Sequence, residues 1–295
     1  MHAIQESILQ WYAKEKRDLP WRHTTDPYKV LVSEMMLQQT QVDRVIVKYT
    51  EFLNKFPTAE VLAHASSAEV IKAWQGLGFN RRALRLQDIC KSVSKLKEFP
   101  TTERELLQLK GIGPYTSSAI VSFAFNRDVV VLDTNIRRVF YRILFKNHTK
   151  QNETLTKELE LLAEKILPKG RSRDWHNALM DLGATICTAQ TPKCSICPVQ
   201  AHCYFTKTLE KATDEEKIEL LSLTRIKNKQ GVFKNSNRYY RGRILDYLRK
   251  EGTVQLSILE KSFKEEYKKD ISFILLALEK DKLISIKNNI ISLPD

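Results

Sequence analysis

The chain has 295 residues, of which 42% are hydrophobic and 28% charged, a composition that excludes a largely disordered chain and a fibrous one. Lys and Arg number 48 against 35 Asp and Glu, which gives a formal net charge of +13 and a pI near 9.4. This excess favours an anionic partner, nucleic acid first and an anionic membrane second. No apolar run reaches the ~18 residues that span a bilayer, and Met1–Trp11 lacks a secretory h-region. We therefore expect a cytoplasmic protein.

Residues 1 to about 204 are predicted to be all-α, because apolar residues recur at three- and four-residue spacing along most of this region. Segments in which this spacing is clear are Ser67–Trp74, Thr116–Phe125 and Trp175–Leu182. Short breaks separate the helical segments at Gly76–Gly78, Gly111–Gly113 and Pro168–Gly170.

The charge divides the rest of the chain. Residues 205–224 carry three Lys against five acids, which is typical of a solvated helical connector. Residues 225–243 hold seven basic side chains and no acidic one, whereas residues 244–295 hold nine of each. The basic excess therefore lies in the first 204 residues and in the linker, not in the C-terminal segment.

The C-terminal segment has the pattern of a winged-helix module. Three helices are predicted, over Gly242–Lys250, Leu256–Phe263 and Ile271–Lys280. Two short β-like runs follow within Ile284–Leu293, around the turn-prone pair Asn288–Asn289. The alternative is a small structural cap on the helical domain, which the module's zero net charge leaves open.

Four of the five cysteines lie within 17 residues, in the spacing C-x6-C-x2-C-x5-C; they are Cys187, Cys194, Cys197 and Cys203. Four thiolates on a compact loop suit a [4Fe–4S] cluster or a structural zinc, and the spacing alone does not choose between them. Cys90 stands apart on a helical segment and is interpreted as a buried small hydrophobe.

The segment around Lys110, Gly111 and Gly113 has the pattern of two helices that flank a Gly-x-Gly turn. Glycines let the backbone approach a phosphate, and the N–H groups that begin the following helix point toward it. This is how a helix-hairpin-helix binds DNA without recognising bases. The alternative is a plain turn between two helices.

Two carboxylates lie in otherwise apolar or neutral surroundings, Glu34 in the segment Ser33–Gln41 and Asp133 in the segment Val131–Asn135. Two carboxyls in different environments can divide the roles of acid and charge stabiliser, as in glycoside cleavage. Asp133, two residues before Asn135, is equally a candidate helix N-cap.

The combination of these motifs resembles the helix-hairpin-helix DNA glycosylases of the endonuclease III superfamily, and within them the adenine DNA glycosylases (MutY). The resemblance covers roughly residues 5–204. Its carriers are Leu19–Arg22, Ser33–Val42, Gly76–Gly78, the hairpin at Leu109–Thr116, Leu132–Asn135, Asp181–Ala184 and the four cysteines. It implies a six-helix barrel with helix-hairpin-helix over 21–126 and an iron-sulfur domain from 1–20 and 127–204. It also implies that the metal is [4Fe–4S].

The resemblance assigns roles to four residues. Glu34 matches the general acid that protonates N7 of a flipped adenine, and Asp133 matches the carboxylate that stabilises the oxocarbenium-like sugar. Tyr115 stands where bifunctional relatives carry a Lys, so we expect base excision without efficient β-lyase activity. Asn135 matches a residue that orients the site.

The resemblance also implies DNA contacts. Gln39, Thr40 and Leu77 match residues near the opposing base, while Phe79 either wedges into the base stack or is an ordinary core aromatic. The expected backbone contacts are Arg81, Arg82, Lys110, Gly111 and Gly113, with the arginines alternatively on a solvated helix face. The expected adenine pocket contains Trp21, Arg22 and Asp181.

The main departure from the family is the C-terminal part, since 225–295 is too short for the nudix-like domain of longer members. A connector and basic linker over 205–243 and a winged-helix-like module over 244–295 are predicted instead. The predicted partner is double-stranded DNA with a mispaired or oxidised base, bound by a nucleoid-associated monomer. The alternatives are a mismatch thymine or uracil glycosylase of the same superfamily and a non-catalytic iron-sulfur DNA-binding protein.

Overall fold

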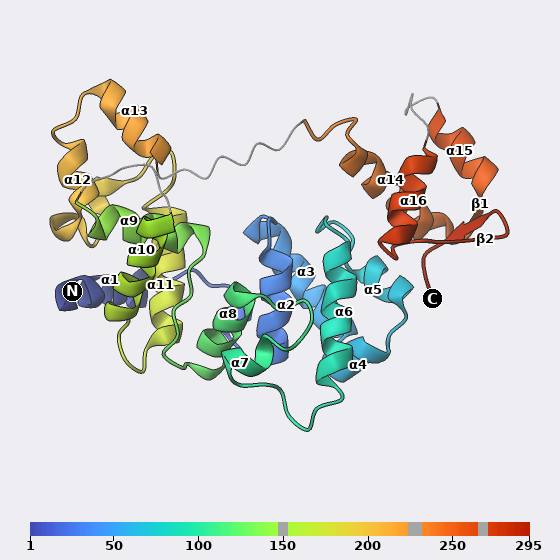
Figure 1. Cartoon of the computed structure of the whole chain (residues 1–295), viewed down its shortest axis with the longest axis horizontal. Coiled ribbons are helices and arrows are strands. Elements are labelled where there is room, and N and C mark those ends of the chain that lie inside the picture. The colour runs from blue at the N-terminus through green and yellow to red at the C-terminus, as the bar shows by residue number, and fades with distance from the viewer. Residues whose placement is uncertain (147–152, 224–231, 265–270) are drawn as a thin grey trace. The chain divides into compact units, whose positions relative to one another are not determined.

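The computed structural model describes residues 1–146, 153–223, 232–264 and 271–295, which form helices and three short strands joined by turns and loops (Figure 1). The helices and loops divide into two compact units. The first consists of Met1–Val30, Thr101–Leu107 and Gly113–Asn228, and the second of Leu31–Pro100, Gln108–Ile112 and Lys229–Asp295. Within the described ranges, no helix has the length and apolar character needed to cross a membrane.

The first unit contains the beginning and the end of the region, roughly residues 5–204, that resembles the glycosylases. Its elements are α1 (His2–Glu15), the 3-10 turn η1 (Pro20–Arg22), α7 (Glu103–Leu106), α8 (Pro114–Phe125), α9 (Thr134–Leu144), α10 (Glu153–Lys165), α11 (Ser172–Thr185), η2 (Cys194–Ile196), η3 (Gln200–His202), α12 (Tyr204–Leu209) and α13 (Asp214–Leu223).

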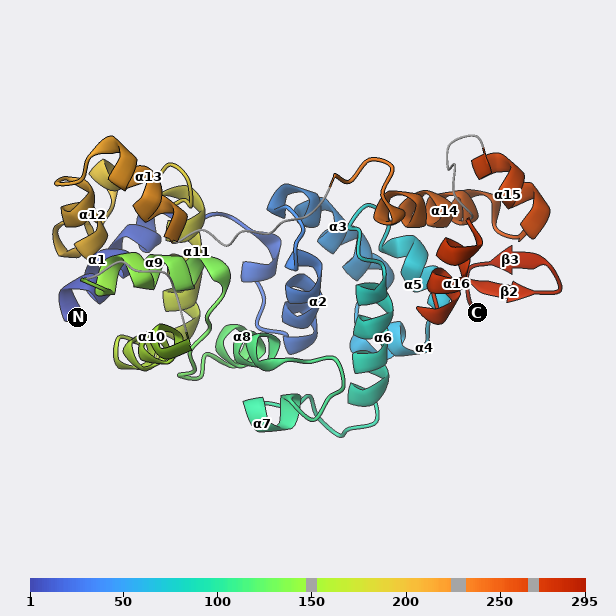
Figure 2. The ribbon, with the colours of Figure 1, turned by 45° about the horizontal axis from the view of Figure 1, so that its top comes forward.

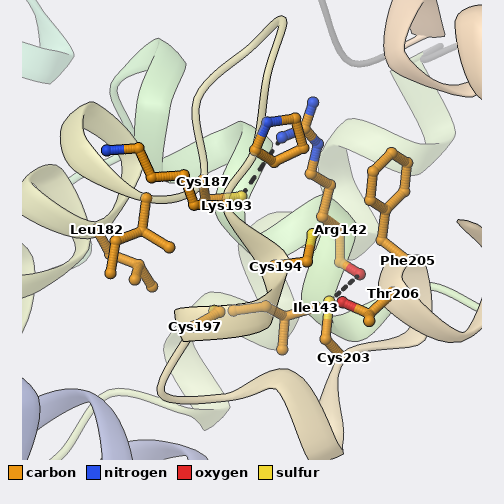
Figure 3. A pocket seen from close by; sticks show the side chains of 12 residues that line it. Arg142, Ile143, Leu182, Cys187, Lys193, Cys194, Cys197, Cys203, Phe205 and Thr206 are labelled. Carbon is orange, nitrogen blue, oxygen red and sulfur yellow. Dashed lines mark hydrogen bonds between the residues drawn. The ribbon is translucent and has the colours of Figure 1, made fainter.

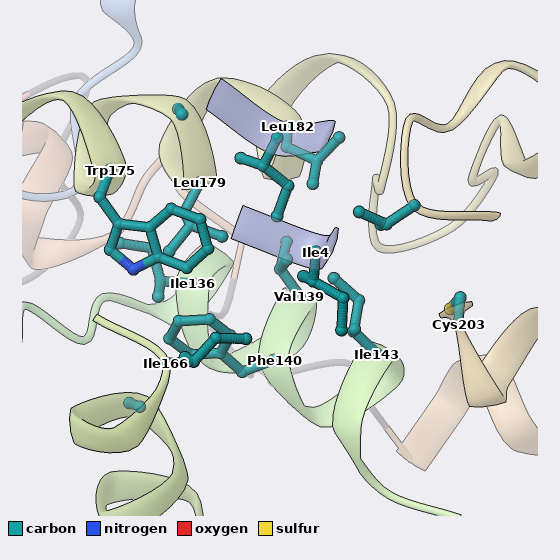
Figure 4. Close-up of a cluster of buried hydrophobic side chains, with 14 of the residues drawn as sticks. Ile4, Ile136, Val139, Phe140, Ile143, Ile166, Trp175, Leu179, Leu182 and Cys203 are labelled. Carbon is teal, nitrogen blue, oxygen red and sulfur yellow. The ribbon is translucent and has the colours of Figure 1, made fainter. Parts of the chain in front are cut away.

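The core of the first unit lies where α1, α9 and α11 meet (Figure 4). Ile4, Val139 and Leu182 come from these three helices and are almost completely buried. Phe140 and Trp175 add a tilted aromatic pair with ring centroids 6.3 Å apart. This packing fixes the N-terminus of α9 relative to α11 and the cysteine loop that follows α11.

The second unit begins within α2 (Pro27–Leu37), from Leu31 onward. The helices that follow before residue 100 are α3 (Val42–Lys55), α4 (Ala59–His64), α5 (Ser67–Ala73) and α6 (Arg81–Val93). Helix α5 begins with a capping box, in which Ser66 and Glu69 satisfy each other's backbone N–H groups. Phe52 and Trp74 pack edge to face, with centroids 5.8 Å apart, between α3 and the end of α5.

The second unit also holds the C-terminal module, in which α14 (Asn237–Glu251), α15 (Leu256–Lys264) and α16 (Ser272–Lys280) accompany a three-stranded antiparallel sheet. The strands β1 (Val254–Gln255), β2 (Ser285–Lys287) and β3 (Ile290–Ser292) lie in the order β1-β3-β2, and Figure 2 shows the β2–β3 hairpin. Asn288 and Asn289 both have positive φ, 51° and 60°, as the two central residues of a tight hairpin turn require.

The predicted fold class is confirmed: a helical body is followed by a winged-helix-like module. Two details differ from the sequence prediction. Helix α14 begins at Asn237 rather than Gly242, because the Ser236 hydroxyl caps it by accepting from Tyr239 N–H. The connector is not merely solvated, since Leu209, Leu220 and Leu221 pack on the first unit's core. Residues 224–231 of the predicted linker lie outside the described residues, and the four-domain division stays a prediction.

Candidate active site and metal centre

Glu34 lies near the C-terminal end of α2, where its side chain enters the interior of the protein. It is 6% exposed, and its neighbours Ser33, Met35 and Met36 are at most 1% exposed. Such a setting excludes bulk water from the carboxyl group, the environment in which acids of glycoside-cleaving enzymes donate a proton. Its environment suits the general acid predicted from sequence.

Asp133 caps the N-terminus of α9, which confirms the N-cap interpretation of this residue given above. Its Oδ1 accepts the Ile136 N–H at 2.6 Å, and its Oδ2 accepts the Asn135 side-chain N–H at 3.0 Å. The side chain is half-buried, and the helix N-terminus carries partial positive charge. Capping and charge stabilisation are therefore compatible roles for one carboxylate, because both use it as a fixed anion.

Arg138 connects this carboxylate to the loop that carries the cysteines. Its Nη2 donates to Asn135 Oδ1 at 2.9 Å and to Gly183 O at 2.7 Å, and its Nε donates to Cys187 O at 2.9 Å. A Cβ at Gly183 would lie 2.9 Å from Asn135 Cβ, closer than real contacts allow. The glycine therefore lets α11 approach the Asp133–Asn135 pair.

Asp181 forms a buried ion pair with two arginines. Its carboxylate accepts from Arg22 Nη1 and Nη2 at 2.6 and 2.7 Å and from Arg17 Nε at 2.5 Å. Burial raises the pKa of Asp181, but the two arginines outweigh this and hold the pKa below its ordinary value. Asp181 is 0% exposed and paired with Arg22, and the role of the two residues in an adenine pocket stays a prediction. The role of Trp21, which is half-buried, stays a prediction.

Arg82 binds the two loops that follow α2 and α5. Its Nη1 donates to Met35 O at 2.8 Å and to Gln38 O, and its Nη2 donates to Thr40 Oγ1 at 3.0 Å and Leu77 O at 3.2 Å. The residue is 7% exposed, and burial lowers its pKa to about 10. In this structure the guanidinium braces the two loops from within, because it faces carbonyl groups and the Thr40 hydroxyl; the phosphate contact stays a prediction.

The two braced loops present different side chains to solvent. Gln39 and Phe79 are exposed, Phe79 to 47%, whereas Leu77 is 2% exposed. Both exposed residues have positive φ, 56° and 45°, a strained conformation for a side chain of this size. Phe79 is therefore not a core aromatic, and its role as a wedge in the base stack stays a prediction.

The predicted hairpin is formed by α7, a turn and α8. Gly111 has φ +108°, and a Cβ there would lie 2.8 Å from Arg85 Cγ, so only glycine fits. Gly113 is the N-cap of α8 and Pro114 its first residue, a common start for a helix because proline has no N–H to pair. Lys110 is exposed and Tyr115 half-buried in the first turn of α8.

The four cysteines come from the loop after α11, η2 and the residue before α12, and they line one pocket (Figure 3). Its other walls are largely apolar and include Leu182, Ile186 and Phe205. Burial raises the pKa of the Cys197 thiol to about 12. Thiolates form in such a pocket when a metal balances their charge, so the donor set fits an iron-sulfur cluster.

Arg142 supplies positive charge beside this pocket. Its Nη1 lies 3.5 Å from Cys187 Sγ and donates to Thr188 O at 2.7 Å, while its own carbonyl lies 3.4 Å from Cys203 Sγ (Figure 3). The side chain is 1% exposed and stacks over the Phe205 ring at 4.7 Å. A cluster held by four thiolates is anionic, and a fixed arginine stabilises it and shapes the loop.

The arginines that organise the site were not predicted from the sequence; they are Arg17, Arg138 and Arg142. The signal that could have found two of them is α9 itself, where Arg138 and Arg142 lie four residues apart on a helix with buried Val139 and Phe140. Charged side chains at such positions are buried only when they are paired. Their acceptors lie more than 40 residues away along the chain, which no local pattern reveals.

Comparison with known proteins agrees with this geometry. A family model described as HhH-GPD superfamily base excision DNA repair protein matches residues 32–165. A second, the iron-sulfur binding domain of endonuclease III, matches residues 187–203. The structure of a thermostable thymine-DNA glycosylase superposes with a TM-score of 0.65 and 31% identity, covering 70% of this chain and 96% of that one. These matches define the class, a helix-hairpin-helix glycosylase fold with an iron-sulfur loop.

The relatives place the chain more narrowly. It is 36% identical to the adenine DNA glycosylase of Mycolicibacterium smegmatis over 250 residues, 83% of this chain and 80% of that protein. It is 40% identical to the Homo sapiens adenine DNA glycosylase over 220 residues, 71% of this chain but only 40% of that protein. The chain belongs to the MutY-type family of the HhH-GPD superfamily, and its cofactor is a [4Fe–4S] cluster, whose binding domain spans the four cysteines.

Proposed function

We propose that the protein is a monofunctional DNA glycosylase that removes adenine paired with 8-oxoguanine or guanine. The observation that carries the proposal is the pair of carboxyls in unlike settings, Glu34 buried near the end of α2 and Asp133 fixed by two hydrogen bonds at a helix N-terminus. The adenine DNA glycosylases that it resembles at 36–40% identity support the choice of base.

The first step is binding of the duplex and extrusion of the adenine. Lys110 and the N-terminal turn of α8 bind backbone phosphates. Phe79 and Gln39, exposed on the loops that Arg82 holds together, enter the space that the extruded base leaves. Leu77 is buried here, so its part in this step is to support the loop.

The second step breaks the bond between C1′ and N9. Glu34 donates its proton to N7 of the adenine, which draws the bonding electrons of C1′–N9 onto the base. The sugar becomes oxocarbenium-like, and Asp133 stabilises its positive charge. Water then adds to C1′ and gives up a proton, so the products are free adenine and an abasic site.

Asn135 and Arg138 keep the stabilising carboxylate in place. Asn135 binds Asp133 Oδ2, and Arg138 binds Asn135 while it also binds Cys187 O. The cluster, when bound, supplies a rigid crosslink of the cysteine loop. The carboxylate therefore depends for its position on the loop that the cysteines fold.

Tyr115 limits the reaction to base removal. It is the second residue of α8, directly after the hairpin turn. A phenol cannot form the imine with C1′ by which bifunctional glycosylases cut the strand. The abasic site therefore leaves the enzyme intact, to be opened by alkali or by another enzyme.

The test is strand cleavage after hot alkali on duplexes that contain A:8-oxoguanine, A:G, T:G or U:G. We expect breaks at adenine only, absent without alkali, and absent for Glu34→Gln. Ratios of single-turnover rates on the first two duplexes measure the preference for 8-oxoguanine. Breaks in the presence of Glu34→Gln at the wild-type rate would overturn the assignment of the acid.

The second candidate is a thymine or uracil glycosylase, which the structural match to a thymine-DNA glycosylase favours. Glu34 argues against it, because a pyrimidine has no N7 to protonate. Breaks at T or U alone would establish it. Binding of the duplexes without any break would instead support a non-catalytic iron-sulfur DNA-binding protein.

The remaining parts of the proposal concern the setting in which the protein works. Its partner is double-stranded DNA that contains the mispair, which the net charge of +13 favours. It acts as a monomer in the cytoplasm, associated with the nucleoid. Sedimentation of the complex with one duplex tests the stoichiometry.

A further inference from the structure

Arg249, on α14 of the C-terminal module, lies against the loop that connects α5 to α6. Its Nη2 donates to Ile71 O at 3.0 Å and to Asn80 Oδ1 at 2.8 Å, and its Nη1 donates to Asp246 Oδ1 at 2.7 Å. The Arg249 side chain is 6% exposed, and burial lowers its pKa. A single guanidinium therefore binds the last turn of α5 and the residue before α6.

The rest of the contact holds α14 in this position. Ile71 is completely buried among side chains of the module, such as Ile244 and Leu248, and Leu84 of α6 packs at the edge of the same cluster. Around it, Asp281 pairs with Arg81 of α6 at 3.2 Å. Apolar burial with a rim of ion pairs is the anatomy of a stable interface rather than of a loose tether.

The loop that Arg249 closes is residues 74–80, the wedge loop. Its residue Phe79 has φ +45° and is 47% exposed, so its conformation is strained and lacks the support of burial. Asn80 is the N-cap of α6, yet its side chain makes no capping hydrogen bond. Its amide oxygen accepts from Arg249 instead, and Arg82 holds Leu77 O from within.

We propose that Arg249 is a positioning residue for base extrusion, and that the C-terminal module acts in the reaction by holding the wedge loop with Phe79 outward. The inference rests on the proposed function, since it needs a loop that enters the DNA. It assigns to this module, whose net charge is zero, a task that requires no contact with DNA.

The experiment compares the full chain with Arg249→Ala, Arg249→Lys and Asn80→Ala, and with both alanine changes together. Lys250→Ala is the matched control, because it removes the same charge from the next residue, whose side chain is 84% exposed. Each protein is assayed on an A:8-oxoguanine duplex for single-turnover excision. Affinity is measured on a duplex with a non-cleavable 2′-fluoro adenosine. A 2-aminopurine beside the target adenine reports extrusion.

We expect Arg249→Ala to lower the excision rate at least about tenfold, which is the effect of losing one hydrogen bond to a charged group. The rise in 2-aminopurine fluorescence should also be smaller, while DNA affinity should change less than about twofold. Arg249→Lys restores part of the rate. The double variant is no slower than the slower single one, because both remove the same contact. Lys250→Ala matches the wild type.

The inference is overturned if Arg249→Ala extrudes and excises adenine like the wild type. It is also overturned if the loss of excision rate is fully explained by an equal loss of DNA affinity, or by a melting temperature so low that the variant is unfolded in the assay. Multiplicative losses in the double variant would also overturn it, since they would show that Arg249 does not act through Asn80. Failure of the proposed function itself is distinct, because the wild type would then release no adenine.

Discussion

Replacing Arg82 by Ala tests the claim that this side chain is an internal brace and not a phosphate contact. Its three closest acceptors are Met35 O, Gln38 O and Thr40 Oγ1. Each buried acceptor left without a donor costs about 1–3 kcal/mol. These costs are not additive, so we expect Arg82→Ala to lower the free energy of unfolding by about 3–5 kcal/mol.

Arg81→Ala is the matched control, since it removes the same charge from the adjacent residue. The Arg81 side chain is 63% exposed and pairs with Asp281, and an exposed pair contributes about 0–1 kcal/mol. Urea unfolding of the two variants therefore separates an internal brace from a surface charge. Arg82→Lys, which keeps the charge but has fewer donors, should fall between the wild type and Arg82→Ala.

The salt dependence of DNA affinity gives the independent measurement. A lost phosphate contact lowers the slope of log affinity against log salt by about one. We expect no such change for Arg82→Ala at temperatures where it is folded. A variant as stable as the wild type, with a reduced salt slope, would refute the structural role and restore Arg82 to the DNA interface.

The buried His176, the cluster ligands and the hairpin tyrosine each give a further test. Burial lowers the pKa of His176 to about 4 from 6.5, so its contribution to stability is present above pH 6.5 and is lost as the pH falls toward 4. Urea titrations should show a loss of about 2 kcal/mol between pH 7 and pH 5, much smaller in His176→Gln. Cys197→Ser should abolish the visible absorbance of the cluster, while Cys90→Ala should keep it; equal spectra would contradict the ligand assignment. Tyr115→Lys should cut the strand without alkali and be trapped on DNA by borohydride, and no adduct would place residue 115 away from C1′.

The fold was largely predictable because its signals are local. Helix periodicity marked the helical body, and the Asn288–Asn289 pair marked the hairpin, since both patterns act within a few residues. Strand β1 was missed because it has two residues and exists only through its pairing of Val254 with Ile291. The start of α14 was missed because the Ser236 cap precedes the apolar pattern of the helix.

The types of residue in the candidate site were predictable from the sequence, but the contacts that these residues make were not. Arg22 and Asp181 were expected together in one pocket, and the structure joins these residues, 159 positions apart, in a buried ion pair. Arg82 was expected on DNA, and the structure places its guanidinium against the carbonyl of Met35. A charged side chain gives no sign in the sequence of whether its partners are internal, so the contacts themselves become visible only in the structure.

The central claim is that Glu34 donates a proton to an extruded adenine, and the most direct measurement is the released base itself. The wild type and Glu34→Gln are incubated with an A:8-oxoguanine duplex, and the supernatant is analysed by mass spectrometry. The account predicts one free adenine per duplex from the wild type and none above background from Glu34→Gln, with equal DNA binding by both. Release of adenine by Glu34→Gln at the wild-type rate would contradict it, and so would release of thymine or uracil from T:G and U:G duplexes with no adenine released from A:8-oxoguanine.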